Sequence, residues 1–226
     1  MSNTVRLVVA THNAGKLTEI RRILTEDLGS DADRIELVTA GQLGLPDPVE
    51  DGVSFEQNAL IKARDVVRRT GLPAIADDSG LIVDVLGSAP GILSARWCGH
   101  HGDDVANYRL LLDQIADIPD ANRTARFRCA AAFVVPEEGR DEAPYSTHNE
   151  NVELGDMRGT IIREPRGEHG FGYDPIFVPY DQPARSGENG GPLTSAEMTP
   201  EEKNAISHRS KAIRALTRSI RRALID

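Results

Sequence analysis

The stretch Pro73 to Asp84, PAIADDSGLIVD, places two adjacent carboxylates, Asp77 and Asp78, between two short apolar runs typical of buried strands. Ionised carboxylates are costly to bury alone, so this pair has to be solvated, paired with basic groups or bound to a cation. One interpretation is a turn whose aspartates cap backbone amides. The other is a pair of Mg²⁺ ligands beside a sheet edge, one of which also acts as a base towards a metal-polarised water.

The size and charge of the chain narrow the class of protein. Its 226 residues are 39% hydrophobic, which suffices for one large α/β domain or two fused lobes. The formal net charge of −9 argues against a protein that wraps a nucleic-acid polymer through phosphate contacts. A nucleotide remains a suitable ligand, because a bound divalent ion reconciles its charge with acidic side chains.

The sequence also indicates a cellular compartment. No apolar run approaches the ~20 residues needed to span a bilayer, and the opening MSNTVRLVVA lacks the features of a signal peptide. We therefore expect no membrane association and a cytoplasmic location. The two cysteines, Cys98 and Cys129, are too few for a disulfide framework and lack zinc-type spacing, although His100 and His101 follow Cys98 closely.

Hydrophobic periodicity in the first half of the chain predicts strands alternating with helices. A strand over 5–10 leads through a tight turn into a helix with Leu17, Ile20, Leu24 and Leu28 on one face. Ser54 and Gln57 predict a capped second helix that ends at Gly71 and buries Leu60, Ala63 and Val67. A third helix is expected over 104–115, with Leu111 and Leu112 inward. Polar and apolar residues alternate at the start of 124–135, as in an antiparallel strand, so we expect a mixed sheet.

The second half adds strand-like segments near Val152 and Ile161 and a polar stretch over 181–196 that predicts a mobile surface loop. Thr199 begins a capping box, with proline at the first helical position. The long terminal helix predicted from there carries the apolar stripe Ile206, Ile213, Leu216, Ile220 and Leu224. We find no internal repeat and no clear linker, so residues 1–226 are predicted to form a single domain.

The motif THNAGK at 11–16 is compared first with a phosphate-binding P-loop. It is not a Walker motif, because Ala10 stands at the first glycine position and Leu17 at the final hydroxyl position. The segment can still bind phosphate in the way a P-loop does. Backbone N–H groups at a helix N-terminus favour an anion, and Thr11, Asn13 and Lys16 add side-chain donors. The alternative is an ordinary turn with a surface lysine.

Three further groups have two interpretations each. Glu50 and Asp51, just before Gly52, complete a metal site or form a solvated turn. The glycine-rich GFGYDP at 170–175 is a base-stacking or phosphate-approach loop, or simply a turn. Basic residues of the last helix belong to the site or form a solvated face: Lys203, His208 and Arg209.

Five motifs together carry a resemblance to a known family. They are THNAGK (11–16), FEQNALIKA (55–63), ADDSGLIVDVLGSAPGILSARW (76–97), GFGYDPIF (170–177) and EEKNAISHR (201–209). In this order they make the chain resemble the inosine triphosphate pyrophosphatases, the Ham1-like family, over essentially its whole length. The resemblance implies an α/β fold with an elongated mixed β-sheet, flanking helices and two lobes around a central substrate cleft. It also implies a homodimer that uses Mg²⁺ to hydrolyse ITP, dITP and XTP to the monophosphate and pyrophosphate.

The resemblance further implies roles for particular residues. Asp78 is the metal ligand and proton acceptor, Glu50 is the upstream metal ligand, and Ser79 touches the substrate. Asp77 is left as a second metal ligand or a structural cap. The phosphates are held by Thr11, His12, Asn13, Ala14, Gly15 and Lys16, and the nucleotide is framed by Phe171, Gly172, Tyr173, Asp174, Lys203, His208 and Arg209. Of these, His208 and Arg209 are the expected donors to the purine 6-oxygen, which would leave a buried donor unpaired against ATP.

Two alternative functions remain open from the sequence. One is a nucleotide pyrophosphatase of different base specificity, similar to the Maf-type enzymes. The other is a non-enzymatic nucleotide-binding module, which has no need of the Asp77–Asp78 pair. Metal-dependent turnover of a panel of triphosphates separates all three hypotheses.

Overall fold

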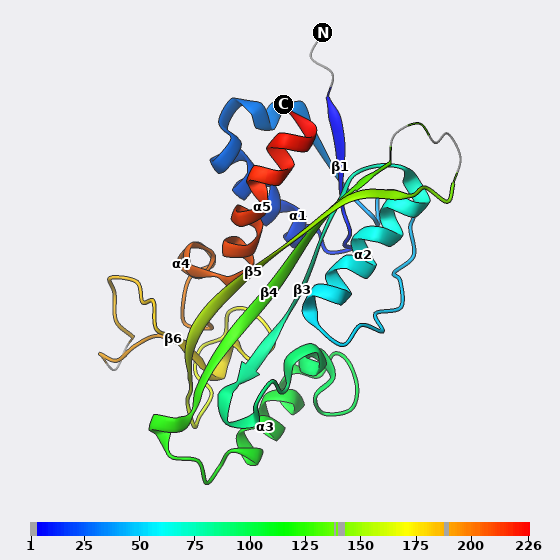
Figure 1. Ribbon diagram of the computed structural model, residues 1–226. Coiled ribbons are helices and arrows are strands. Elements are labelled where there is room, and N and C mark those ends of the chain that lie inside the picture. The colour runs from blue at the N-terminus through cyan, green and yellow to red at the C-terminus, as the bar shows by residue number, and fades with distance from the viewer. Residues whose placement is uncertain (1–3, 138, 140–142, 188–189) are drawn as a thin grey trace. The chain divides into compact units, whose positions relative to one another are not determined.

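The computed structural model describes residues 4–137, 139, 143–187 and 190–226. Within them one six-stranded sheet has the order β2-β1-β3-β4-β5-β6 (Figure 1). The strands are β1 (Val5–Val9), β2 (Ile35–Thr39), β3 (Ala74–Val83), β4 (Thr124–Pro136), β5 (Thr147–Ile161) and β6 (Phe177–Pro179). The helices are α1 (Ala14–Leu28), α2 (Phe55–Thr70), α3 (Asp104–Gln114), α4 (Pro200–Ile206) and α5 (His208–Leu224).

The sheet is mixed, as predicted. Strand β1 pairs in parallel with β2 and β3, whereas β5 pairs antiparallel with β6. The two strand-like segments predicted near Val152 and Ile161 are one strand, β5. The α/β class and the mixed sheet with flanking helices are confirmed.

The chain forms two compact units, each assembled from separate segments. Unit 1 contains Met1–Asp78, Cys129–Gly155 and Arg209–Asp226, and unit 2 contains Ser79–Arg128 and Asp156–His208. Strand β3 passes from one unit to the other between Asp78 and Ser79. The single domain and the substrate cleft expected from the sequence stay predictions.

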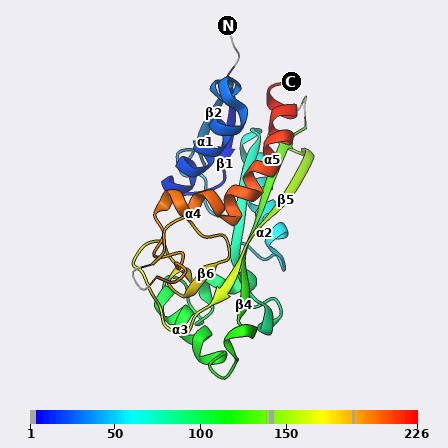
Figure 2. The ribbon, with the colours of Figure 1, turned by 90° about the vertical axis from the view of Figure 1, so that its left-hand side faces the viewer.

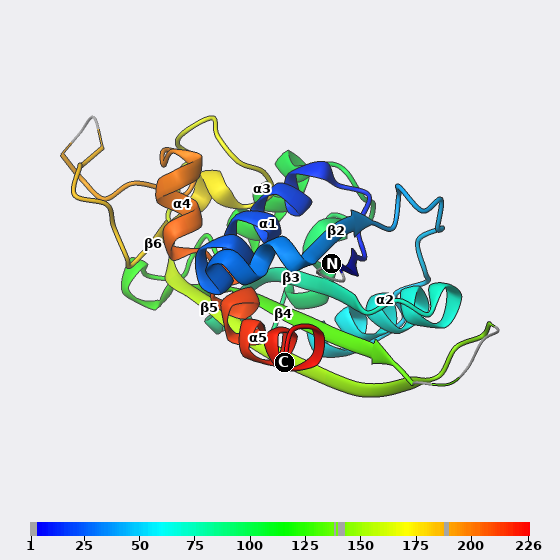
Figure 3. The same ribbon diagram turned by 90° about the horizontal axis from the view of Figure 1, so that it is seen from above.

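In unit 1, helices cover both faces of the sheet. Helices α1 and α5 lie on one face and α2 on the other (Figures 1, 2 and 3). Apolar residues of α1 and α5 pack in one core against β1, β3 and β4, which contribute Leu7, Val9, Ile75, Cys129, Ala131 and Phe133. Consecutive residues of a strand point to opposite faces, so the α1 and α5 face takes the odd-numbered residues of β1 and β3.

Unit 2 has its own apolar core. Leu111 of α3 and Ile115, which caps that helix, pack with the second half of β3 and with β4, β5 and the segment before β6. The sequence prediction is confirmed for Leu111, but Leu112 is only half-buried. Unit 2 thus combines residues that lie far apart in the chain.

The predicted ends of α2 are confirmed in part. Ser54 is the N-cap and accepts a hydrogen bond from the Gln57 backbone, and Gly71 closes the helix in the left-handed conformation at φ 66°. The Gln57 side chain, however, accepts from Val53 N instead of Ser54 N, so the capping box is incomplete. Leu60, predicted in the core, is half-buried.

The terminal helix is broken into two. Thr199 forms the predicted capping box of α4, but Ser207 is extended, at φ −64° and ψ 147°, and ends that helix. The apolar stripe divides at this residue. Ile206 packs with the core of unit 2, whereas Ile213, Leu216 and Ile220 belong to the core of unit 1.

The prediction of a surface loop over 181–196 is wrong for the C-terminal end of this segment. Residues Leu193 to Ala196 are buried, and the Gln182 amide donates to the carbonyl oxygens of Pro179 and Leu193. These bonds satisfy buried backbone groups, which explains why a polar segment is held inside. Positions 188 and 189 lie outside the described residues. In the described part of the chain, no helix has the length and apolar character needed to cross a membrane.

Candidate active site

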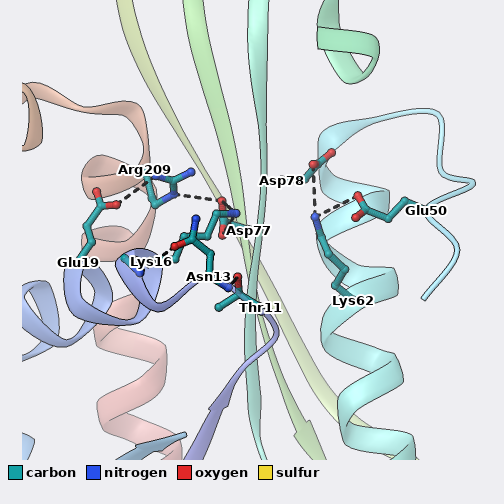
Figure 4. A network of polar contacts seen from close by, with 10 residues as sticks. Thr11, Asn13, Lys16, Glu19, Glu50, Lys62, Asp77, Asp78 and Arg209 are labelled. Carbon is teal, nitrogen blue, oxygen red and sulfur yellow. Dashed lines mark hydrogen bonds and ion pairs between the residues drawn. The ribbon is translucent and has the colours of Figure 1, made fainter. Parts of the chain in front are cut away.

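The two adjacent aspartates lie in the middle of a strand. Residues 74–83 form the uninterrupted strand β3, so of the two interpretations of ADDSG the turn is excluded. Because neighbouring side chains in a strand point to opposite faces, Asp77 points towards α1 and α5 and Asp78 towards α2 (Figure 4). Strand β1 ends at Val9, which pairs with Ile75, so both aspartates lie just beyond its end.

Asp77 is held by two basic side chains on the α1 and α5 face. Its carboxylate is 4% exposed and accepts from Lys16 Nζ at 3.0 and 3.1 Å and from Arg209 Nε at 3.1 Å. Arg209 also donates through Nη1 to Glu19 Oε2 at 3.1 Å. Asp77 is therefore the centre of a buried ion-pair network, and neither a helix cap nor a lone carboxylate (Figure 4).

The charges around Asp77 keep it ionised. Burial acts to raise its pKa, but the positive charges of Lys16, Arg209 and Lys62 outweigh burial and hold the pKa well below its usual value. The pKa of Arg209 is raised, because Asp77 and Glu19 outweigh its own burial. Each partner thus stabilises the charged form of the other.

Asp78 faces a separate cluster on the α2 side. Asn58 Nδ2 donates to Asp78 Oδ2 at 3.1 Å, and Lys62 Nζ lies 3.4 Å from Asp78 Oδ1 and 3.1 Å from Glu50 Oε2. Lys62 is 14% exposed on its side chain. Burial raises the pKa of Asp78 and outweighs the opposing charge of Lys62 and the Asn58 hydrogen bond. The Asp78 carboxyl is therefore a better proton acceptor than an ordinary aspartate.

The Asp78 cluster suits a divalent cation. Glu50 and Asp78 already place carboxylate oxygens on either side of one cation, the Lys62 ammonium group. Among the described residues no group of three or more His, Cys, Asp or Glu is placed to hold a metal. Mg²⁺ needs only one or two carboxylates, because waters and substrate phosphates complete its six ligands. The donor set therefore fits Mg²⁺ better than a metal that requires an all-protein cage.

The THNAGK segment forms the loop between β1 and α1. Asn13 is the N-cap of α1 and accepts from Gly15 N at 2.8 Å, while Thr11 Oγ1 accepts from Asn13 N at 3.1 Å. The first turn of the helix has no acidic residue, so the positive end of its dipole is not neutralised. With Lys16 in this turn, the loop has the features of an anion-binding helix N-terminus.

Two other residues of the loop are placed differently. His12 Nε2 lies 3.2 Å from Asp47 Oδ1, on an exposed part of unit 1, so it links this loop to the segment before Glu50. Ala14 is the first residue of α1. The six predicted phosphate-binding residues are thus contiguous in one loop and helix turn.

The glycine-rich motif at 170–175 forms a loop in unit 2 that is held by several hydrogen bonds and an ion pair. The Asp174 carboxylate is buried, accepts from Phe171 N at 2.9 Å and pairs with Lys203 Nζ, whose ammonium lies 5.0 Å from the Phe171 ring centroid. Gly172 N donates to Asp104 Oδ2 at 2.7 Å, and Tyr173 Oη donates to the Ser94 carbonyl at 2.9 Å. These bonds present the Phe171 ring to solvent, where it is 67% exposed.

Two more predicted residues belong to unit 2. His208 stacks on Phe127, with ring centroids 5.2 Å apart and planes 16° apart. Ser79 follows Asp78 on β3 and is half-buried. The predicted site residues therefore divide between the two units. The unit 1 group contains Thr11 to Lys16, Glu50, Asp78 and Arg209, and the unit 2 group contains Ser79, Phe171 to Asp174, Lys203 and His208.

Sequence reasoning missed three residues of the unit 1 group. Asn58 and Lys62 lie four positions apart in the FEQNALIKA motif, so they share one face of α2. Glu19 lies three positions after Lys16 on α1 and pairs with Arg209. The spacing of Asn58 and Lys62 is visible in the sequence, but their partner Asp78 is recognisable only once β3 places it opposite α2.

Comparison with known proteins identifies the family. The Ham1 family is matched over residues 7–219, and the chain belongs to it. A relative from Bifidobacterium longum (strain DJO10A), named dITP/XTP pyrophosphatase, is 63% identical over 96% of this chain and 98% of its own. A solved HAM1 protein from Coxiella burnetii is 36% identical, with a TM-score of 0.78, and covers 97% of this chain and 100% of its own. A solved nucleoside-triphosphatase / dITP/XTP pyrophosphatase from Mycobacterium abscessus is 48% identical, with a TM-score of 0.70 and coverage of 94% and 98%.

Proposed function

We propose that this protein is a Mg²⁺-dependent pyrophosphatase that hydrolyses the non-standard purine nucleoside triphosphates dITP, XTP and ITP to the monophosphate and pyrophosphate. The observation that carries the proposal is the cluster of Glu50, Lys62 and Asp78, of which Asp78 lies on β3 just after the point where the loop before α1 is hydrogen-bonded to that strand. The name dITP/XTP pyrophosphatase, borne by relatives that cover nearly the whole chain, supports the substrate class.

Asp78 is the proposed proton acceptor. Hydrolysis of a phosphoanhydride requires a water aligned with the leaving group and a base to take its proton. The raised pKa of Asp78 makes it a stronger proton acceptor than an ordinary aspartate, and the hydrogen bond from Asn58 fixes its orientation. Lys62 lies beside the same carboxylate and counters negative charge that develops on the phosphates.

Glu50 and Asp78 would hold the metal ion. When bound, Mg²⁺ polarises the attacked phosphate and neutralises charge on the departing pyrophosphate. Lys62 occupies the space between the two carboxylates, and its flexible stem lets the ammonium move towards a phosphate group. The same three residues therefore supply a base, two ligands and a positive charge.

The loop after β1 is the proposed phosphate site. The hydrogen bond from Ala10 N to Ile75 O, 2.8 Å long, ties this loop to β3 just before the aspartates. The N-terminus of α1 and Lys16 lie on the Asp77 face, and Lys62 lies on the Asp78 face (Figure 4). We propose that the triphosphate contacts both lysines where β1 ends and β3 continues.

The unit 2 group is proposed to bind the nucleoside. Phe171 presents an exposed ring suited to stacking on a purine, and Lys203 lies against that ring. His208 of this group and Arg209 of the unit 1 group remain the proposed donors to the 6-oxygen of inosine and xanthosine. The amino group of ATP cannot accept such a hydrogen bond, so ATP is expected to be a poor substrate.

A substrate panel tests the proposed function. ITP, XTP, ATP, GTP, dTTP and UTP are each assayed for pyrophosphate release, with Mg²⁺ and with excess chelator. Strong release from ITP and XTP that requires Mg²⁺ supports the proposal. Preference for a pyrimidine triphosphate would instead indicate a Maf-like specificity, and binding without turnover would indicate a non-enzymatic module.

Replacing Lys16 by Met should weaken binding of the triphosphate much more than binding of inosine. The reason is that the ammonium faces phosphate and contributes charge-assisted hydrogen bonds that the nucleoside does not use. Arg209 still pairs with Asp77 in this variant, so the fold should be retained. Calorimetric titration with a non-hydrolysable ITP analogue and with inosine measures the difference. An equal loss for both ligands would place Lys16 outside the phosphate site.

The homodimer and the cytoplasmic location expected from the sequence stay predictions. Light scattering of the purified protein tests the first, with twice the chain mass as the expected result and a monomer as the contradicting one.

A further inference from the structure

Asn58 is a buried polar residue with two partners on different segments. It is the fourth residue of α2 and 4% exposed, at a position past the N-cap where asparagine is not a favoured residue. Its Nδ2 donates to Asp78 Oδ2 at 3.1 Å, and its Oδ1 accepts from Gly52 N at 3.0 Å. One amide therefore connects the proposed catalytic carboxylate with the loop that carries Glu50.

The contact with the loop is unusually close. A Cβ at Gly52 would lie 2.5 Å from Asn58 Oδ1 and 2.8 Å from Gln57 Cβ, so only glycine brings the backbone this near to α2. The next residue, Val53, donates its N–H to Gln57 Oε1 at 2.8 Å. The side chains of Gln57 and Asn58 thus both accept hydrogen bonds from this loop. Of the two, Asn58 also donates a hydrogen bond to Asp78.

We propose that Asn58 is a positioning residue that fixes Glu50 and Asp78 relative to each other, so that their oxygens converge on one divalent cation. The inference rests on the proposed function of this site. Partners that orient metal ligands typically change metal affinity by about 10- to 100-fold when they are removed. Asn58 acts through the two ligands: it donates to the Asp78 carboxylate and accepts from the loop that carries Glu50, so its removal should lower metal affinity.

The test compares Asn58→Leu with the control Gln57→Leu. Each variant loses one hydrogen bond to the loop, and Asn58→Leu also loses the hydrogen bond to Asp78, which keeps Lys62 as a partner. Titration calorimetry with Mn²⁺ as the probe, on the substrate-free protein, measures metal affinity directly. Asn58→Leu should bind Mn²⁺ about 10-fold or more weakly than the wild type, and Gln57→Leu within about 2-fold. Raising the Mg²⁺ concentration should restore ITP turnover in Asn58→Leu.

The other outcomes are decisive as well. Equal Mn²⁺ affinity in the two variants, or turnover that high Mg²⁺ fails to restore, would overturn the inference. If Asn58→Leu does not fold, Asn58→Ser replaces it in the same titration with the same expected result. If the wild type binds Mn²⁺ and hydrolyses ITP while the Asn58 variant binds Mn²⁺ normally, the inference about Asn58 is wrong but the proposed function stands. A wild type that binds no Mn²⁺ would overturn the proposed metal site and this inference together.

Discussion

Asp78→Asn is expected to lower the turnover of ITP by at least ~10²-fold, the lower range for the loss of a general base. Asn has almost the same shape but accepts no proton and carries no charge for a metal. Lys62 keeps Glu50 as its partner, so the variant leaves no buried cation unpaired. Steady-state pyrophosphate release at saturating Mg²⁺ measures the effect.

The same substitution should not destabilise the fold. Burial raises the pKa of Asp78, so the folded state binds this proton more tightly than the unfolded state. At neutral pH the ionised carboxylate therefore opposes folding, and a neutral amide removes that cost. We expect the melting temperature of Asp78→Asn to equal or exceed that of the wild type. Near-normal turnover in a folded Asp78→Asn variant would contradict the assignment of Asp78 as base.

Asp77→Asn is expected to have the opposite effect on stability, with a loss of about 3 kcal/mol. Removing one partner of a buried ion pair leaves charges without compensation, and here Lys16 and Arg209 lose the carboxylate that they share. In a chain of this size that loss lowers the melting temperature by about 6–12 °C. Differential scanning calorimetry of both variants, side by side, provides the matched comparison.

The stability contributed by Asp77 should also depend on pH. Its folded-state pKa lies below the unfolded value, so its contribution is complete above about pH 4 and is lost as the pH falls through the folded-state pKa. The difference in stability between wild type and Asp77→Asn should therefore shrink in acid. A difference that stays constant from neutral pH to strong acid would show that the Asp77 charge is not what stabilises the fold.

Local signals in the sequence predicted the helices well. Ser54 and Gly71 mark the ends of α2, and Thr199 marks the start of α4, because caps depend only on neighbouring backbone groups. The break at Ser207 was missed, since the residues on its two sides pack in the cores of different units. Such a break depends on tertiary packing, which overrides a continuous helical pattern.

The central strand could not be predicted in the same way. Asp and Gly are poor strand formers, so the sequence leaves a turn at ADDSG open as an alternative to a metal site, yet β3 continues through it. Buried cations hold Asp77, and Asn58 and Lys62 hold Asp78; these partners come from helices distant in sequence. The motif predicted which residues matter, but which face each aspartate occupies depends on the position of β3 in the sheet.

The measurement that tests the central claim most directly is the rate of pyrophosphate release from ITP, per folded molecule, for Asp77→Asn and Asp78→Asn. Both are assayed at one temperature well below their melting points. If the neighbouring aspartates serve the fold and the chemistry separately, Asp77→Asn should be at least ~10-fold more active than Asp78→Asn, because only the latter loses the base. Equal rates, or a less active Asp77→Asn, would contradict this division between the two faces of β3.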